Sequence, residues 1–65
     1  MDLSKDRALR PDQAALILNT SKRTIYRLVE EGNFTTFKLR GSLRIMERSV
    51  YKYINRQIER QILDN

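Results

Sequence analysis

The 65-residue sequence contains neither cysteine nor histidine, and it has only one proline and two glycines. Without cysteine, the chain forms no disulfide and no thiolate metal site. Without histidine, it lacks the commonest metal ligand and the usual general base of enzymes. A phosphate-binding glycine loop is also missing. We therefore predict a protein that is not an enzyme and that has no catalytic residues, no metal and no cofactor.

Long apolar runs are missing as well, and none is long enough for a signal peptide or a membrane span. On this ground we expect a cytoplasmic protein with no membrane partner. The length predicts a single domain with a small core, because a chain of about 60 residues buries only about 60% of its unfolded surface.

Positive charge is concentrated in the later part of the chain, which has 13 Lys and Arg against 8 Asp and Glu and a net charge of +5. Residues 1–21 carry three charges of each sign, whereas residues 22–60 carry ten basic residues and four acidic ones. On composition alone, ordinary solubility explains this excess as well as a polyanion-binding face does.

The excess begins within residues 21–32, a segment that is typical of a short helix with both ends marked. Ser21 is a good N-cap residue, and Gly32 suits the left-handed residue that closes a helix. At about 100° per residue, an apolar face lies opposite a face with two arginines and a tyrosine. These faces are Ile25, Leu28 and Val29 on one side and Arg23, Tyr26 and Arg27 on the other.

A second short helix is predicted just before this one. Pro11 fits the first helical position and Asp12 favours the positive helix end, while Asn19 tolerates the left-handed conformation that ends a helix. Only Asn19 and Thr20 then separate this helix from the Ser21 cap. Two helices joined so tightly must cross steeply, as in a helix-turn-helix.

After Gly32 apolar and polar residues alternate, which indicates a half-buried hairpin. A two-residue loop at Arg40-Gly41 would place apolar residues opposite polar ones. We therefore prefer a three-residue loop, residues 40–42, which pairs Leu39 with Leu43 and Phe37 with Ile45 on one apolar face. Lys38 and Arg44 would then share the other face. Their repulsion would be relieved by an anion, although a merely solvated face is the alternative.

The last segment, from about residue 47 to 63, is predicted to be helical because two sets of residues recur every four positions. The apolar set is Val50, Ile54, Ile58 and Ile62, and the basic set is Arg48, Lys52, Arg56 and Arg60. A basic amphipathic helix can also bind a membrane surface or calmodulin. We favour packing of its first half onto the hairpin and the first helix.

Taken together, residues 9–55 resemble the excisionase-type branch of the MerR-like winged-helix DNA-binding domains. The resemblance rests on the run Ser21-Lys22-Arg23-Thr24-Ile25-Tyr26-Arg27-Leu28, followed by Lys38, Gly41, Arg44 and Ile45. It implies a mainly α fold with a small β-hairpin, a winged helix-turn-helix. Residues 1–8 are then a flexible leader, and residues 56–65 are a C-terminal helical extension or tail.

The resemblance also implies double-stranded DNA as the partner, with the second helix in the major groove and the hairpin as a wing on the backbone or minor groove. The recognition-helix positions are Ser21, Lys22, Arg23, Thr24, Tyr26 and Arg27, and the wing positions are Lys38, Arg40, Gly41, Ser42 and Arg44. Alternatives remain open at three places. Arg27 could pair with Glu30 or Glu31, Tyr26 could pack on the wing, and Ser21 and Thr24 could serve only as caps.

Several positions depart from the family pattern. Arg10 replaces the usual serine or threonine cap, Asn19 a turn glycine, and Met46 a proline; Ser42 and Leu43 replace a basic residue and a tryptophan. Many family members are excisionases or recombination directionality factors of phages and integrating elements, and this is the predicted function. The alternatives are a small transcription regulator and a protein-interaction module using the C-terminal helix. Ile58 and Ile62 are the predicted surface for an integrase or an adjacent copy.

Overall fold

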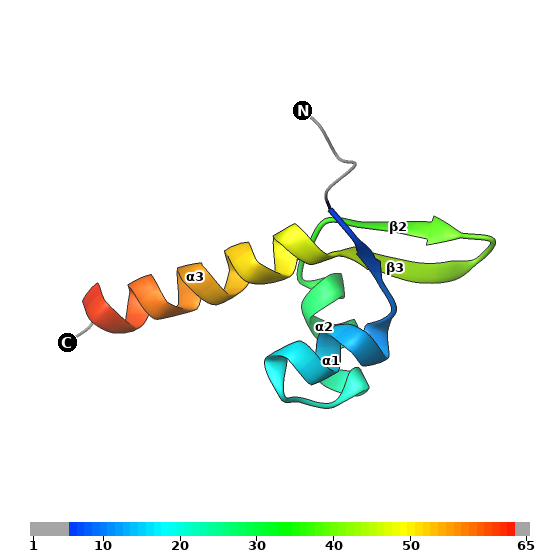
Figure 1. The fold of residues 1–65 in the computed structure, drawn as a ribbon. Helices are drawn as coiled ribbons and strands as arrows, with labels where there is room; N and C mark the ends of the chain where they lie inside the picture. Colours follow the sequence, from blue (N-terminus) through cyan, green and yellow to red (C-terminus); the bar gives the residue numbers. More distant parts are fainter. Residues whose placement is uncertain (1–5, 64–65) are drawn as a thin grey trace.

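The computed structural model describes residues 6–63, which form a helix-turn-helix, a small antiparallel sheet and a long third helix (Figure 1). The elements in chain order are β1 (Ala8–Leu9), α1 (Pro11–Leu18), α2 (Lys22–Glu30), β2 (Thr36–Leu39), β3 (Ser42–Met46) and α3 (Glu47–Leu63). This is the mainly helical, winged helix-turn-helix fold that the sequence predicts.

The predicted ends of the first two helices are confirmed. Pro11 is the first residue of α1, and Asn19 closes the helix in the left-handed conformation with φ 53°. The hydroxyl of Ser21 accepts a hydrogen bond from the backbone N–H of Thr24 at 3.2 Å, so Ser21 caps α2. Gly32 follows α2 with φ +80°, as expected of the residue that ends the turn.

The strand order is β1-β3-β2, so β3 lies in the middle of the sheet. The sequence does not predict strand β1, and Ala8, its first residue, falls in the predicted flexible leader. Leu9 pairs with Ile45, and the Glu47 N–H donates to the carbonyl of Arg7 at 2.8 Å. The carboxylate of Asp6 accepts the N–H of Arg48 at 2.9 Å. Residues 6–8 therefore belong with the domain, which corrects the predicted boundary, while residues 1–5 of the leader lie outside the described residues.

The predicted register of the hairpin is wrong by one residue. Leu39 pairs with Ser42 and Lys38 with Leu43, so the loop is the two-residue Arg40-Gly41. Both loop residues have positive φ, 52° and 82°, as a type I′ turn requires. This turn matches the strand twist and outweighs the gain from collecting all apolar residues on one face.

The corrected register separates the predicted apolar and basic faces. Ile45 is buried and Leu43 partly buried on the inner face, whereas Phe37 and Leu39 lie on the outer face, with 43% and 51% of their surface exposed. Lys38 lies opposite Leu43, and Arg44 lies opposite Phe37, so these two basic residues start from different faces of the hairpin. The repulsion predicted between them is therefore not a cross-strand contact.

The turn makes a prediction that separates folding from binding. Arg40→Asn is expected to raise the free energy of unfolding by about 0.5–1 kcal/mol, because Asn adopts positive φ more readily and Asn-Gly is the favoured type I′ sequence. Urea unfolding followed by circular dichroism measures the change. Arg40→Lys, which keeps the conformational cost, is the control and should leave stability unchanged. A lower stability of the Asn variant would contradict the assigned turn.

The core is assembled from one or two residues of each of five elements. Leu9 of β1, Ala14 of α1, Ile25 of α2, Ile45 of β3 and Val50 of α3 are each at most 1% exposed. Because α2 and the hairpin bury side chains in the same cluster, the core fixes the position of the wing relative to the second helix.

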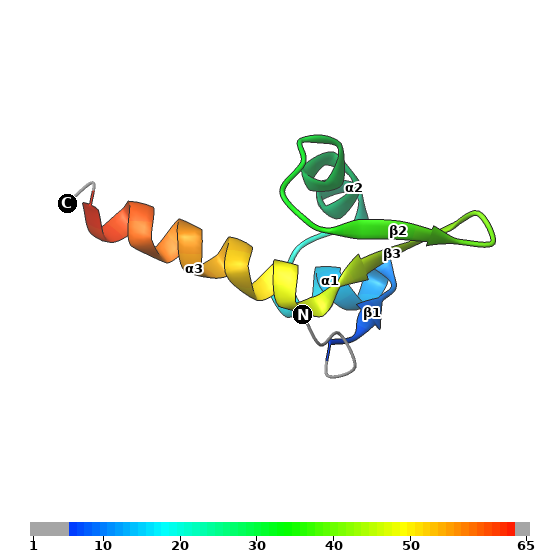
Figure 2. The same ribbon diagram turned by 90° about the horizontal axis from the view of Figure 1, so that it is seen from above.

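Helix α3 starts on this core and then leaves it (Figures 1 and 2). The rings of Tyr53 and Phe34 meet edge to face with centroids 5.4 Å apart, and the Arg56 guanidinium donates to the carbonyl of Asn33 at 3.3 Å. From residue 57 to 63 every side chain of α3 is exposed. The first half of α3 therefore packs on the core and on the loop before β2, and the second half projects. No helix within residues 6–63 is long and apolar enough to cross a membrane.

Candidate nucleic-acid interface

Helix α2 turns one face to the core and the other to solvent, as its sequence predicts. Ile25 is fully buried, while Lys22, Arg23, Tyr26 and Arg27 are exposed. Within residues 6–63, neither arginine forms an ion pair, so the alternative pairing of Arg27 with Glu30 or Glu31 is not observed. The exposed face therefore offers two guanidinium groups, four residues apart, to a ligand.

The N-terminal end of α2 is ordered by its own hydroxyl groups. Besides accepting from the Thr24 N–H, the Ser21 hydroxyl lies 3.1 Å from the hydroxyl of Thr24. Ser21 is thus the N-cap of α2 and Thr24 is its hydrogen-bond partner, while contact of either residue with DNA stays a prediction. The cap occupies one of the free amides of the first turn, and Lys22 follows it directly.

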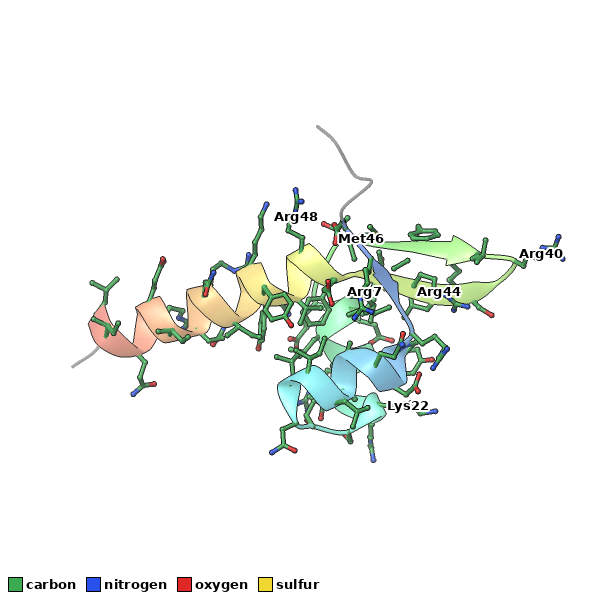
Figure 3. All side chains as sticks on the ribbon, viewed as in Figure 1. Arg7, Lys22, Arg40, Arg44, Met46 and Arg48 are labelled. Carbon is green, nitrogen blue, oxygen red and sulfur yellow. The ribbon has the colours of Figure 1, made fainter. Side chains whose placement is uncertain are left out.

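A hollow of about 380 Å³ lies between the start of α1, the start of α2 and the hairpin. We call it the basic hollow, because side chains from three elements bring positive charge to it. The basic residues are Arg10, Lys22, Lys38 and Arg44, and Asp12, Tyr26, Gly41 and Ser42 also line it. Figure 3 shows Lys22 below the hairpin and Arg40 at its tip.

The structure thus divides the predicted residues into two groups. Lys22 and Tyr26 of the recognition helix lie at the basic hollow together with four of the five predicted wing residues. Arg23 and Arg27 lie on the exposed face of α2 outside it, and Arg40 extends the hairpin tip beyond it. Tyr26 lines the basic hollow on the side of α2 that faces the wing. It is 48% exposed, so it is also accessible to solvent.

Two charged residues of the basic hollow, Arg10 and Asp12, were missed by the sequence interpretation. The Arg10 Nε lies 3.2 Å from a carboxylate oxygen of Asp12, and the hydrogen bond from Arg10 holds the pKa of that carboxyl below its usual range. Arg10 had been noted only as a poor N-cap. Its backbone N–H donates instead to the side chain of Gln13 at 2.9 Å, as in a capping box. The sequence signal for Arg10 was that a basic residue, which is a poor N-cap, stands directly before the start of a helix.

Comparison with known proteins agrees with this architecture. A family model described as a helix-turn-helix domain matches residues 8–58. The chain belongs to this family. No curated protein and no solved structure matches the chain. The helix-turn-helix match begins in β1 and ends two residues after Arg56, close to the point where α3 leaves the core.

Membership of the helix-turn-helix family implies DNA binding. In such domains the second helix enters the major groove, and the first helix crosses the sugar-phosphate backbone. In this chain, α2 is the second helix and has the exposed arginine face. The basic hollow adjoins the starts of both helices, where phosphate contacts are made in this arrangement.

Proposed function

We propose that the protein binds duplex DNA in a sequence-specific manner and acts as an excisionase, or recombination directionality factor, of a phage or integrating element. The observation that carries the DNA-binding part is the basic hollow, where four basic residues from the start of α1, from α2 and from the wing lie beside the exposed arginine face of α2. Its geometry suits a phosphate backbone running between the recognition helix and the wing.

In this arrangement the roles of the basic residues differ. Arg23 and Arg27 enter the major groove, where an arginine can donate two hydrogen bonds to one guanine edge. Lys22, Lys38 and Arg44 contact phosphate oxygens, which position the protein and carry little sequence information. Arg40 at the hairpin tip reaches the neighbouring backbone or minor groove.

The excisionase assignment is supported by the resemblance of residues 9–55 and by the projecting end of α3. Ile58 and Ile62 are 52% and 66% exposed there, as a surface for an integrase or an adjacent copy would be. A small transcription regulator would use the same DNA interface. In a reconstituted reaction with an integrase and its attachment sites, an excisionase stimulates excision, whereas a regulator changes only transcription from its site.

DNA binding itself is tested by selecting duplexes from a random library and titrating the best of them at increasing salt. The logarithm of the binding constant should fall by about 0.9 for each tenfold rise in salt and each phosphate contacted. Binding that ignores salt, or the failure of every duplex to bind, would refute the proposed function.

Among residues 6–63, Asp12 is the one carboxylate at the basic hollow, and its removal should strengthen DNA binding. On a duplex with a single site at low salt, Asp12→Asn is expected to bind roughly two- to five-fold more tightly. Glu59→Gln removes the same charge far along α3 and serves as the control, with no change expected. Equal effects of both variants would show that net charge alone is responsible.

This effect should depend on pH in a defined direction. The pKa of Asp12 is lowered by its hydrogen bond from Arg10, so the carboxylate keeps its charge as the pH falls through the ordinary carboxyl range. The wild type should therefore approach the affinity of Asp12→Asn only below that range. Convergence of the two proteins at a pH above the ordinary range would contradict the Arg10–Asp12 contact.

A further inference from the structure

The sheet has a second hollow, of about 430 Å³, that shares no residue with the basic hollow. We call it the outer hollow. Phe37 and Met46 of the hairpin and Ser49 of α3 line it, and Arg48 and Lys52 stand at it from the first turns of α3. Figure 3 shows Met46 and Arg48 on the side of the sheet away from Lys22. The volume is in the range of sites that bind apolar groups.

The charges around the outer hollow favour an acidic occupant. Arg48 and Lys52 are exposed and one helical turn apart, and neither side chain forms an ion pair within residues 6–63. Asp6 is also at this hollow, but its carboxylate accepts the backbone N–H groups of Arg7 and Arg48, both at 2.9 Å. The surface thus combines an exposed phenyl ring with two basic side chains that form no ion pair with any residue from 6 to 63.

The projecting end of α3 carries the complementary groups. Ile58, Ile62 and Leu63 are 52%, 66% and 82% exposed. At 100° per residue, Glu59 falls between Ile62 and Leu63 on the helix surface, whereas Arg60 falls outside this face. We call Ile58, Glu59, Ile62 and Leu63 the α3 tip. It presents apolar side chains around one carboxylate.

The α3 tip cannot reach the outer hollow of its own chain. Lys52 and Glu59 belong to one continuous helix, α3, and are held roughly 10 Å apart along its axis. Only a second copy can bring the two surfaces together. Because they are different patches, each added copy leaves one free tip and one free outer hollow at the two ends of the assembly.

We propose that copies of this chain associate head to tail, with the α3 tip of one copy seated in the outer hollow of the next and Glu59 beside Lys52 of its neighbour. The contact is small compared with the ~1,200–2,000 Å² buried in stable protein complexes, so it is weak in free solution. Copies bound to adjacent DNA sites would meet at an effective concentration on the order of millimolar, where a weak contact becomes effective. The inference adds an assembly mode to the proposed DNA binding but rests on different surfaces.

Two singly disabled variants of the full chain test the proposal without DNA. The tip variant, Ile58→Ser with Ile62→Ser, disables the α3 tip and keeps the outer hollow. The hollow variant, Arg48→Glu with Lys52→Glu, disables the outer hollow and keeps the α3 tip. All four positions are exposed, and matching melting curves confirm that both variants fold. At high concentration the wild type should sediment beyond a dimer, each variant alone should stay monomeric, and their equimolar mixture should stop at a dimer.

Nuclear magnetic resonance of the ¹⁵N-labelled tip variant locates the contact. Adding the unlabelled hollow variant should shift the amide resonances of Phe37, Met46 and Ser49. Gln61→Ser is the control on α3 and should associate like the wild type. Glu59→Lys should lose association, and combining it with Lys52→Glu in one chain should restore it. A mixture that fails to associate, or shifts that lie elsewhere, would overturn the proposal. If a DNA duplex shifts the amide resonances of the outer hollow in the wild type, and the mixture of the two variants stays monomeric, the surface binds nucleic acid instead.

Discussion

Replacing Arg23 or Arg27 with alanine is expected to weaken binding to the selected duplex by about 1–3 kcal/mol each, and to weaken binding to unrelated duplexes far less. Both side chains lie on the exposed face of α2, and Ile25 anchors the opposite face in the core. In the major groove, each would lose its contact with a base edge, which only the cognate sequence provides in the correct place. Fluorescence anisotropy with the selected and a scrambled duplex at one salt concentration measures the difference.

Lys38→Ala and Arg44→Ala are the matched controls for this experiment. Both side chains belong to the basic hollow, so their loss should weaken binding to all duplexes alike. Each should also reduce the slope of log affinity against log salt by about 0.9. If instead the wing variants changed sequence preference and the α2 variants did not, the roles assigned to helix and wing would be reversed.

Ile25→Ala is expected to lower the free energy of unfolding by about 2–5 kcal/mol, a large share of the total stability. Deleting a fully buried isoleucine side chain costs about 2–5 kcal/mol, and a domain of this size is stabilised by only about 3–10 kcal/mol in total. Ile25 is 0% exposed and contacts a core to which five elements contribute. Urea unfolding followed by circular dichroism gives the free energy of unfolding for the wild type and the variant.

Leu16→Ala provides the control on the neighbouring helix. Leu16 is 80% exposed, so its truncation removes little buried surface, and the expected change is within about 0.5 kcal/mol. Comparable losses at Leu16 and Ile25 would mean that the buried face of the helix-turn-helix has been assigned wrongly.

The helix-turn-helix was predictable because its ends depend on local chemistry. Ser21, Asn19 and Gly32 each act within one turn of their own helix, and the phase of Ile25 follows from spacing alone. The hairpin register was not predictable in the same way. The predicted register places all apolar residues on one face of the hairpin. In the structure, Phe37 and Leu39 lie on its outer face and Leu43 and Ile45 on its inner face. Arginine as a residue type also gives no indication that Arg40 adopts the left-handed backbone conformation.

Strand β1 and the basic hollow were missed because both depend on contacts that are distant in the sequence. A two-residue strand is too short to show periodicity, and the partner of Leu9 is Ile45. Arg10 and Asp12 flank the first residue of α1, yet they lie at the same hollow as Lys38 and Arg44. Only the packing of α1 and the sheet on one core brings these side chains together. The DNA contacts proposed for α2 and the wing are predictions.

The pairing of β1 with β3 has a consequence for how the protein is made. During translation Leu9 is synthesised well before the strand that covers it, which contains Ile45. Val50, which completes the buried cluster, follows later still. Until then α1 and α2 have only each other to pack against, and two short helices alone are marginal in water. We expect the domain to fold in a single cooperative step, and only after the hairpin and the start of α3 have emerged from the ribosome.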